Sequence, residues 1–140
     1  MKEIGHEGQL KLKSARVLIV GAGGLGSPAL MYLAGAGIGT LGVVDADKVD
    51  ESNLHRQIIH NQDWVGKHKV ASAKHSISQF NRNVTVKTYE VHFTPENALS
   101  IIKDGDWQIV MDCSDNAPTR YLVSDAAVAA KVPLVSGSAI

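Results

Sequence analysis

The sequence has little of what several protein classes require. Cys113 is the single cysteine among 140 residues, so an internal disulfide and a cysteine-rich zinc site within this chain are excluded. We therefore expect a reducing, cytoplasmic compartment. Charge of neither sign is in excess, because 14 lysine and arginine residues balance 14 aspartate and glutamate residues. This balance argues against a polybasic protein that binds nucleic acid or a membrane surface.

The N-terminal segment lacks the apolar stretch of a secretory signal. Residues 17–44 contain no charged side chain, a stretch long enough to resemble a membrane span. However, eight glycines and one proline interrupt it, and a strand–turn–helix–strand unit buried on both sides has the same low charge. We favour this buried α/β interpretation, because 44% hydrophobic and 20% charged residues are typical of a globular domain.

Apolar runs and helical patterns alternate along the whole chain. This alternation predicts an α/β fold of the Rossmann-like, doubly wound type, with a mainly parallel sheet and helices on both faces. The predicted strands are 16–20, 40–45, 84–91, 108–112 and 133–136, and the predicted helices are 29–36, 66–80, 94–102 and 117–130. Residues 46–65 are polar and irregular, with at most short helical turns. Because the chain stops just past a central strand, we expect residues 1–140 to be one domain, incomplete at its C-terminus.

A glycine-rich loop follows the first predicted strand. Gly21, Gly23 and Gly26 have the spacing Gly-x-Gly-x-x-Gly before a helix, which fits the dinucleotide-binding fingerprint. Glycine lets the backbone approach a phosphate or ribose, and the helix N-terminus offers unpaired N–H groups. Asp45 ends the second predicted strand, where it can accept hydrogen bonds from ribose hydroxyls. The alternative is that the glycines only allow close packing of the helix on the sheet.

Two basic residues separate an ATP-using enzyme from a nicotinamide dehydrogenase. Arg56 lies in the polar segment 52–57, and Lys69 lies in the first turn of the next predicted helix. A dehydrogenase does not need these cations, whereas a triphosphate that loses pyrophosphate needs positive charge on its leaving group. The alternative is an ordinary solvated basic face. A Walker-type loop is excluded, because no Gly-Lys-Ser/Thr follows the glycines.

A second polar motif, residues 112–116, lies at the carboxyl end of a predicted strand, where ligands of such sheets bind. Asp115 can hold Mg²⁺ there while a triphosphate supplies the remaining oxygens. The alternative is that the acids of this motif cap the helix that begins near Pro118. Cys113 lies beside acids that raise the pKa of a thiol, so we expect a buried small residue rather than a nucleophile.

The combination of these motifs resembles the MoeB/ThiF family, relatives of the ubiquitin-activating enzymes. The matching segments are 17–26, 45–47, 52–57, 66–69 and 112–116. Residues 112–121, DCSDNAPTRY, are most similar to the adenylyltransferase/sulfurtransferase branch. The resemblance implies acyl adenylation. The C-terminal glycine carboxylate of a ubiquitin-like sulfur-carrier protein ending in Gly-Gly attacks ATP and releases pyrophosphate, in molybdopterin (molybdenum cofactor), thiamine or tRNA-thiolation sulfur transfer.

The resemblance also implies which residues bind the nucleotide. They are Gly21, Gly23, Gly24, Gly26, Asp45, Ser52, Asn53, Leu54, His55, Arg56, Lys69, Asp115 and Asn116. Among these, Asp45 binds the ribose, and Asp115 binds Mg²⁺ through ATP. Asn53, Arg56 and Lys69 contact phosphates. Arg56, Lys69 and Asp115 are thus the implied catalytic residues. No general base is needed, because a carboxylate is already an anion and catalysis consists of positioning and charge neutralisation.

The chain departs from the family pattern in three respects. The arginine-rich element near the start, the paired Cys-x-x-Cys ligands of the family's structural zinc, and the later conjugating or sulfur-handling cysteine do not occur in residues 1–140. We therefore expect the N-terminal, nucleotide-binding half of an adenylyltransferase, and we expect a homodimer because relatives form one. Two alternatives stay open, namely a non-catalytic fragment that binds nucleotide or a partner, and an NAD-dependent oxidoreductase.

Overall fold

The computed structural model of the chain describes residues 2–138, in which five strands form one parallel sheet. The strands are β1 (Arg16–Val20), β2 (Thr40–Val44), β3 (Thr85–Tyr89), β4 (Ile109–Asp112) and β5 (Leu134–Ser136). Their order is β3-β2-β1-β4-β5, so the direction of winding reverses at β1. Val20 at the end of β1 pairs with Val44 of β2 and Asp112 of β4. The carboxyl ends of these three strands therefore lie level, at the position where ligands of doubly wound sheets bind.

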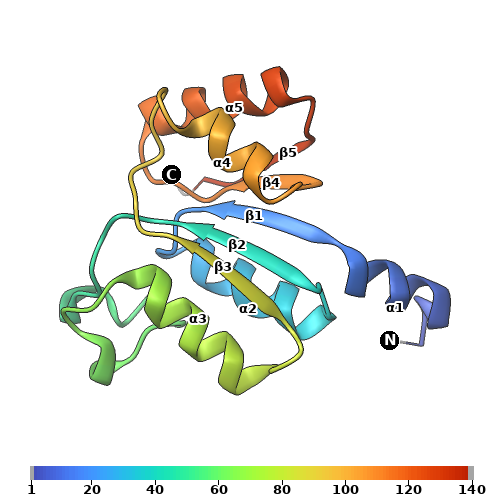
Figure 1. The fold of residues 1–140 in the computed structure, drawn as a ribbon. Helices are drawn as coiled ribbons and strands as arrows, with labels where there is room; N and C mark the ends of the chain where they lie inside the picture. The colour runs from blue at the N-terminus through green and yellow to red at the C-terminus, as the bar shows by residue number, and fades with distance from the viewer. Residues whose placement is uncertain (1, 139–140) are drawn as a thin grey trace.

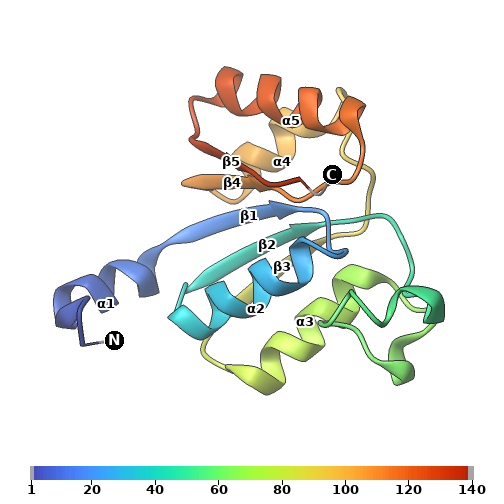
Figure 2. The same cartoon turned by 180° about the vertical axis from the view of Figure 1, so that it is seen from behind.

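Helices cover both faces of the sheet, which confirms the predicted Rossmann-like, doubly wound fold (Figures 1 and 2). α2 (Gly26–Ala36) and α3 (Lys69–Phe80) pack on one face, and α4 (Ala98–Asp104) and α5 (Ala117–Ala130) pack on the other. The apolar run of β1 explains this arrangement. Ile19 joins the core beneath α2 and α3, whereas Leu18 joins the core beneath α4 and α5. A strand buried on both faces has a continuous apolar sequence.

The uncharged stretch of residues 17–44 folds as β1, α2 and β2. Gly37 ends α2 in the left-handed conformation, at φ +95°, which glycine adopts without strain. Among residues 2–138, no helix is both long enough and apolar enough to cross a membrane.

Several elements differ from the prediction by a few residues, and the helix predicted over 29–36 begins at Gly26. The other helices show three further differences. The first helix, α1 (Gly5–Ser14), was not predicted, and it buries none of its residues, so its sequence has no strong apolar stripe to signal it. α3 begins at Lys69 rather than at 66, because Gly66 has a φ of +84°, outside the helical region. α4 begins at Ala98 rather than at 94, because Thr94 and Asn97 close a turn of their own, with the Thr94 N–H donating to Asn97 Oδ1.

The polar segment between β2 and α3 is a closed loop, which we name the 48–68 loop. It contains two short 3-10 turns, η1 (Glu51–Asn53) and η2 (Gln62–Trp64), as the sequence predicts. Backbone hydrogen bonds close its base. The Val49 N–H donates to the Lys67 carbonyl at 2.8 Å, the Gly66 N–H to the Val49 carbonyl at 2.8 Å, and the Lys69 N–H to the Asp47 carbonyl at 2.9 Å. These bonds hold the loop beside the carboxyl edge of the sheet.

Candidate functional site

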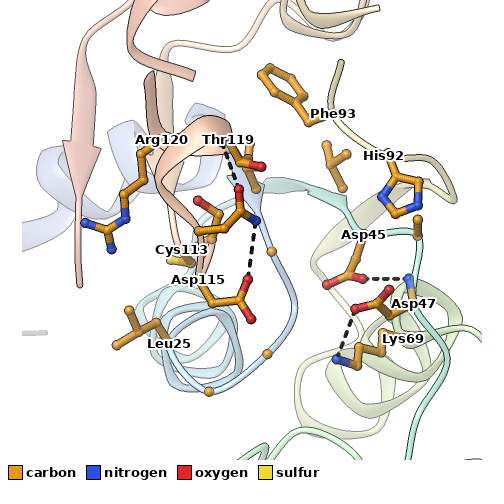
Figure 3. A pocket seen from close by; sticks show the side chains of 18 of the residues that line it. Leu25, Asp45, Asp47, Lys69, His92, Phe93, Cys113, Asp115, Thr119 and Arg120 are labelled. Atoms are coloured by element: carbon orange, nitrogen blue, oxygen red, sulfur yellow. Dashed lines mark hydrogen bonds and ion pairs between the residues drawn. The ribbon is translucent and has the colours of Figure 1, made fainter. Parts of the chain in front are cut away.

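A pocket of about 770 Å³ opens at the carboxyl ends of the central strands. Its wall brings together most of the residues that the sequence singled out, namely Gly21, Gly23, Gly24, Asp45, Arg56, Lys69, Asp115 and Asn116. Figure 3 shows Asp45, Asp47 and Lys69 on one side of this pocket and Asp115 on the other. Four segments distant in sequence thus meet here: the glycine loop, the end of β2, the 48–68 loop with the start of α3, and the loop after β4.

The glycine loop is shaped by two close backbone approaches. Gly21 has a φ of +102°, and a Cβ on it would lie 2.7 Å from the carbonyl oxygen of Cys113. A Cβ on Gly26 would overlap the carbonyl oxygen of Gly21. Gly26 is not part of the pocket wall. At Gly26, then, the absent side chain serves the packing of α2 against the loop, which is the alternative that the sequence left open.

The start of α2 presents hydrogen-bond donors to the pocket. Within residues 2–138, the N–H groups of Gly23 and Gly24 donate to no partner, and both residues line the pocket. The guanidinium of Arg56 lies against Gly24, with Nη1 2.9 Å from the position that a Cβ would occupy. Free N–H groups, the positive end of the α2 dipole and a permanent cation together favour an anion.

Lys69 adds a second cation from the start of α3. Its side chain is almost fully buried, and Nζ lies 3.8 Å from Oδ2 of Asp47, whose own side chain is 67% exposed. A cation in the first turn of a helix is opposed by the helix dipole. The loose pairing with an exposed carboxylate leaves Lys69 able to contact an anion in the pocket.

Other predicted nucleotide-binding residues of the 48–68 loop, namely 52–55, lie outside the pocket wall, whereas Gln57 is part of it. Asn53 Oδ1 accepts a hydrogen bond from Arg56 Nη2 at 3.2 Å, which orients the guanidinium. Ser52 donates from its N–H and its hydroxyl to Asp50 Oδ1, at 2.8 and 2.6 Å, and these bonds lower the pKa of Asp50. Ser52 and Asn53 do not line the pocket, and neither do Leu54 and His55. Direct contact between these four residues and a nucleotide stays a prediction.

Asp45 is fixed by backbone donors on both sides. Its Oδ2 accepts the N–H of Ala22 at 2.8 Å, and its Oδ1 accepts the N–H of Asp47 at 2.8 Å. Each carboxylate oxygen can accept more than one hydrogen bond, so both oxygens retain capacity for a hydroxyl. The ribose contact of Asp45 stays a prediction that this geometry permits.

Side-chain hydrogen bonds organise the loop after β4. The buried Asp112 accepts the N–H and the hydroxyl of Ser114 on Oδ1, at 3.0 and 2.5 Å. Asn116 caps α5, since its Oδ1 accepts the N–H of Thr119 at 2.9 Å. The cap of this helix is therefore an amide rather than one of the acids. Asp115 is exposed on the pocket wall.

The described acids can hold a metal ion only together with a ligand. Within residues 2–138, no three His, Cys, Asp or Glu side chains are grouped to bind one. Asp115 offers a single exposed carboxylate, which suits Mg²⁺ when phosphate oxygens and water complete its six ligands. The Mg²⁺ assignment fits this donor set and stays a prediction.

Cys113 lies in the pocket wall between the glycine loop and Asp115. Burial, with a smaller contribution from the charge of Asp112, raises the pKa of the Cys113 thiol to about 11. The thiol therefore holds its proton at neutral pH, which agrees with the expectation that Cys113 is not an activated nucleophile. The residue is only partly buried, rather than buried as expected.

Sequence reasoning missed part of the pocket wall. Val91, His92 and Phe93 line it beyond β3, on a segment that was assigned in part to the strand itself. Arg120 lines it from the first turns of α5 and donates from Nη2 to the Gly137 carbonyl at 2.9 Å. The position of residues 91–93 directly after a parallel strand was the available signal, because such ends face the ligand crevice.

Comparison with known proteins gives consistent matches along the chain. The model of the ThiF family matches residues 1–140. The adenylyltransferase and sulfurtransferase uba4 of Aspergillus clavatus is 58% identical over 138 residues, which are 99% of this chain and 28% of that protein. The adenylyltransferase and sulfurtransferase MOCS3 of Anopheles gambiae is 51% identical over 140 residues, all of this chain and 31% of that protein. The chain thus spans less than a third of these curated relatives.

Solved structures match the fold. The Escherichia coli tRNA N6-threonylcarbamoyladenosine dehydratase TcdA, in complex with AMP and in complex with ATP, superimposes with a TM-score of 0.91 at 30% identity, over 96% of this chain and 55% of that chain. Escherichia coli MccB with ATP gives a TM-score of 0.81 at 29% identity, over 91% of this chain and 38% of that chain.

Proposed function

The chain belongs to the ThiF family, and on this premise we propose that residues 1–140 form the Mg·ATP-binding part of an enzyme that adenylates the C-terminal glycine of a ubiquitin-like sulfur-carrier protein. The observation that carries the proposal is the convergence of Arg56, Lys69 and the free N–H groups of Gly23 and Gly24 on one pocket. Supporting it, relatives that are 51–58% identical are named adenylyltransferases, and two similar structures hold ATP.

The reaction requires little beyond positioning and charge. A carboxylate oxygen of the carrier attacks the α-phosphorus of ATP, and the bond from that phosphorus to the bridging oxygen of the β-phosphate breaks. The products are the acyl adenylate and pyrophosphate. Negative charge accumulates on the leaving pyrophosphate, which Arg56 and Lys69 neutralise, while the N–H groups at the start of α2 orient the phosphates. Mg²⁺ held by Asp115 would screen the phosphate charges.

Thermal unfolding with added nucleotide tests the proposal. A ligand at about 100 times its Kd adds about 2.7 kcal/mol to stability, which raises Tm by several degrees in a domain of this size. We expect this shift with Mg·ATP and none with NADH. Arg56→Ala and Asp115→Ala should abolish it. Arg82→Ala and Asp125→Ala are the matched controls, because both residues are exposed and lie outside the pocket wall.

The two alternatives predict different results. A Tm shift with NADH alone would favour an oxidoreductase, in which Arg56 and Lys69 would have no phosphate leaving group to stabilise. A shift with Mg·ATP but no pyrophosphate exchange in the presence of a Gly-Gly-tailed carrier would favour a nucleotide-binding module without turnover. Self-association into a dimer belongs to the same proposal, and light scattering that gives the mass of a monomer at high concentration would contradict it.

A further inference from the structure

A buried histidine connects the glycine loop to α3. His60 is 5% exposed, its Nε2 lies 2.8 Å from the carbonyl oxygen of Ala22, and its Nδ1 lies 2.7 Å from Oγ of Ser72. A carbonyl oxygen can only accept, so Nε2 carries the hydrogen, and Nδ1 accepts from the Ser72 hydroxyl. These two contacts select a single neutral tautomer of the ring.

The N–H group of Ala22 is held as well as its carbonyl oxygen. The N–H of Ala22 donates to Asp45 Oδ2 at 2.8 Å, so two side chains from different segments hold both polar backbone groups of Ala22. The peptide bond between Ala22 and Gly23 is trans. In a trans peptide, the carbonyl and the following N–H point in opposite directions. The bond to His60 therefore directs the N–H of Gly23 away from the buried ring, and Gly23 lines the pocket.

This peptide needs an external restraint. Gly23 has no Cβ, so a rotation of the Ala22–Gly23 peptide plane meets little steric resistance. A rotated peptide would turn a carbonyl oxygen toward the pocket in place of an N–H group. That oxygen would repel the phosphates that Arg56 and Lys69 attract.

We propose that His60 is a positioning residue of the phosphate site, which locks the Ala22–Gly23 peptide so that the Gly23 N–H faces the bound nucleotide. The inference rests on the proposed function, because the nucleotide supplies the phosphate. The surroundings of the ring favour a neutral imidazole, mainly through burial. Burial lowers the pKa of His60 most strongly, the bond to Ala22 raises it, Lys69 lowers it, and Asp45 raises it, with a net lowering.

Two substitutions of His60 separate this role from general packing. In His60→Gln, the amide nitrogen can reach the place of Nε2 and donate to the Ala22 carbonyl. In His60→Asn, the shorter amide reaches only the place of Nδ1, so it keeps the contact with Ser72 and loses Ala22. Calorimetry should measure the Kd of each variant for Mg·ATP and for adenosine, and urea unfolding of the same samples should report stability.

We expect the Gln variant to bind Mg·ATP nearly as tightly as the wild-type chain, and the Asn variant to bind it about tenfold more weakly, the usual effect of one hydrogen bond to a charged group. Adenosine affinity should stay unchanged in both, because adenosine has no phosphate. Equal Mg·ATP affinity of the wild-type and Asn chains would overturn the role of His60, as would an equal loss of ATP and adenosine binding. Failure of the wild-type chain to bind Mg·ATP would instead overturn the proposed function.

A measurement on the wild-type chain alone keeps the inference testable if the variants do not fold. The ¹⁵N chemical shifts of the His60 ring distinguish a nitrogen that carries hydrogen from one that does not. We expect hydrogen on Nε2 and a bare Nδ1 at pH 7. Hydrogen on Nδ1 alone would contradict donation to Ala22 and overturn the proposal.

Discussion

Two loops on neighbouring parallel strands face the same pocket and are built in opposite ways. The glycine loop, residues 21–26, joins β1 to α2, and the acidic loop, residues 112–116, joins β4 to α5. Missing side chains shape the glycine loop, because Gly21 and Gly26 bring backbone atoms closer than any Cβ allows. Side-chain hydrogen bonds shape the acidic loop, through Asp112 and the Asn116 cap.

The two loops differ in which groups hold the fold and which groups can contact a ligand. In the glycine loop, the backbone itself presents the donors, and at Gly21 and Gly26 an added methyl group would meet a backbone carbonyl oxygen and disturb the fold at once. In the acidic loop, Asp112 and Asn116 support the fold, while Asp115 between them is exposed on the pocket wall and, among residues 2–138, accepts only a long hydrogen bond, 3.5 Å from Asn116 Nδ2. Substitutions should therefore have abrupt effects in the first loop and graded effects in the second.

Gly26→Ala is expected to cause the largest loss of stability. The new methyl group would overlap the Gly21 carbonyl oxygen, a backbone atom that cannot move aside. We expect a loss of more than about 3 kcal/mol in the free energy of unfolding, measured in urea. Gly23→Ala is the matched control, because its methyl group would meet the Gln57 amide nitrogen at 3.6 Å, an ordinary contact. Similar losses in the two variants would show that the loop is not shaped by close backbone contact.

Asn116→Ala is expected to cause a smaller loss of stability. The substitution removes the acceptor for the Thr119 N–H at the start of α5, and loss of a helix cap costs about 1 kcal/mol. Asn116→Ser should restore most of the stability, since a serine hydroxyl can accept the same bond. If the serine variant unfolds in urea as readily as the alanine variant, the cap does not hold this loop.

The last effect is expected at Cys113, where the two loops touch, and it is confined to alkaline pH. Because the pKa of its thiol is raised to about 11, the folded chain retains the thiol proton above pH 9, whereas the unfolded chain releases it. The resulting contribution to stability is present below pH 9 and is lost as the pH rises from 9 to 11. Iodoacetamide should alkylate the folded chain slowly at pH 8, and faster as the pH approaches 11. The urea-unfolded chain, as control, should react around pH 9, and rapid alkylation of the folded chain at pH 8 would contradict the protected thiol.

The features that the sequence predicted well are those with local signals. The apolar run of β1, the spacing of Gly21 to Gly26, and the acid after β2 each lie within a few residues. The position of His60 was missed because it depends on distant contacts. His60 gains its position from Ala22, 38 residues away, and from Ser72 in α3. α1 gave no apolar stripe because none of its residues is buried.

The hydrogen bonds that close the base of the 48–68 loop predict that this side of the pocket opens and closes as one unit. The amides of Val49, Gly66 and Lys69 form one set of bonds across that base, so a single opening motion exposes all three to hydrogen exchange with solvent. Arg56 lies on this loop and lines the pocket, so we expect the same motion to move its guanidinium. If the proposed nucleotide binds Arg56 or Lys69, we expect exchange to slow at all three amides together, by the factor through which the nucleotide favours the closed loop.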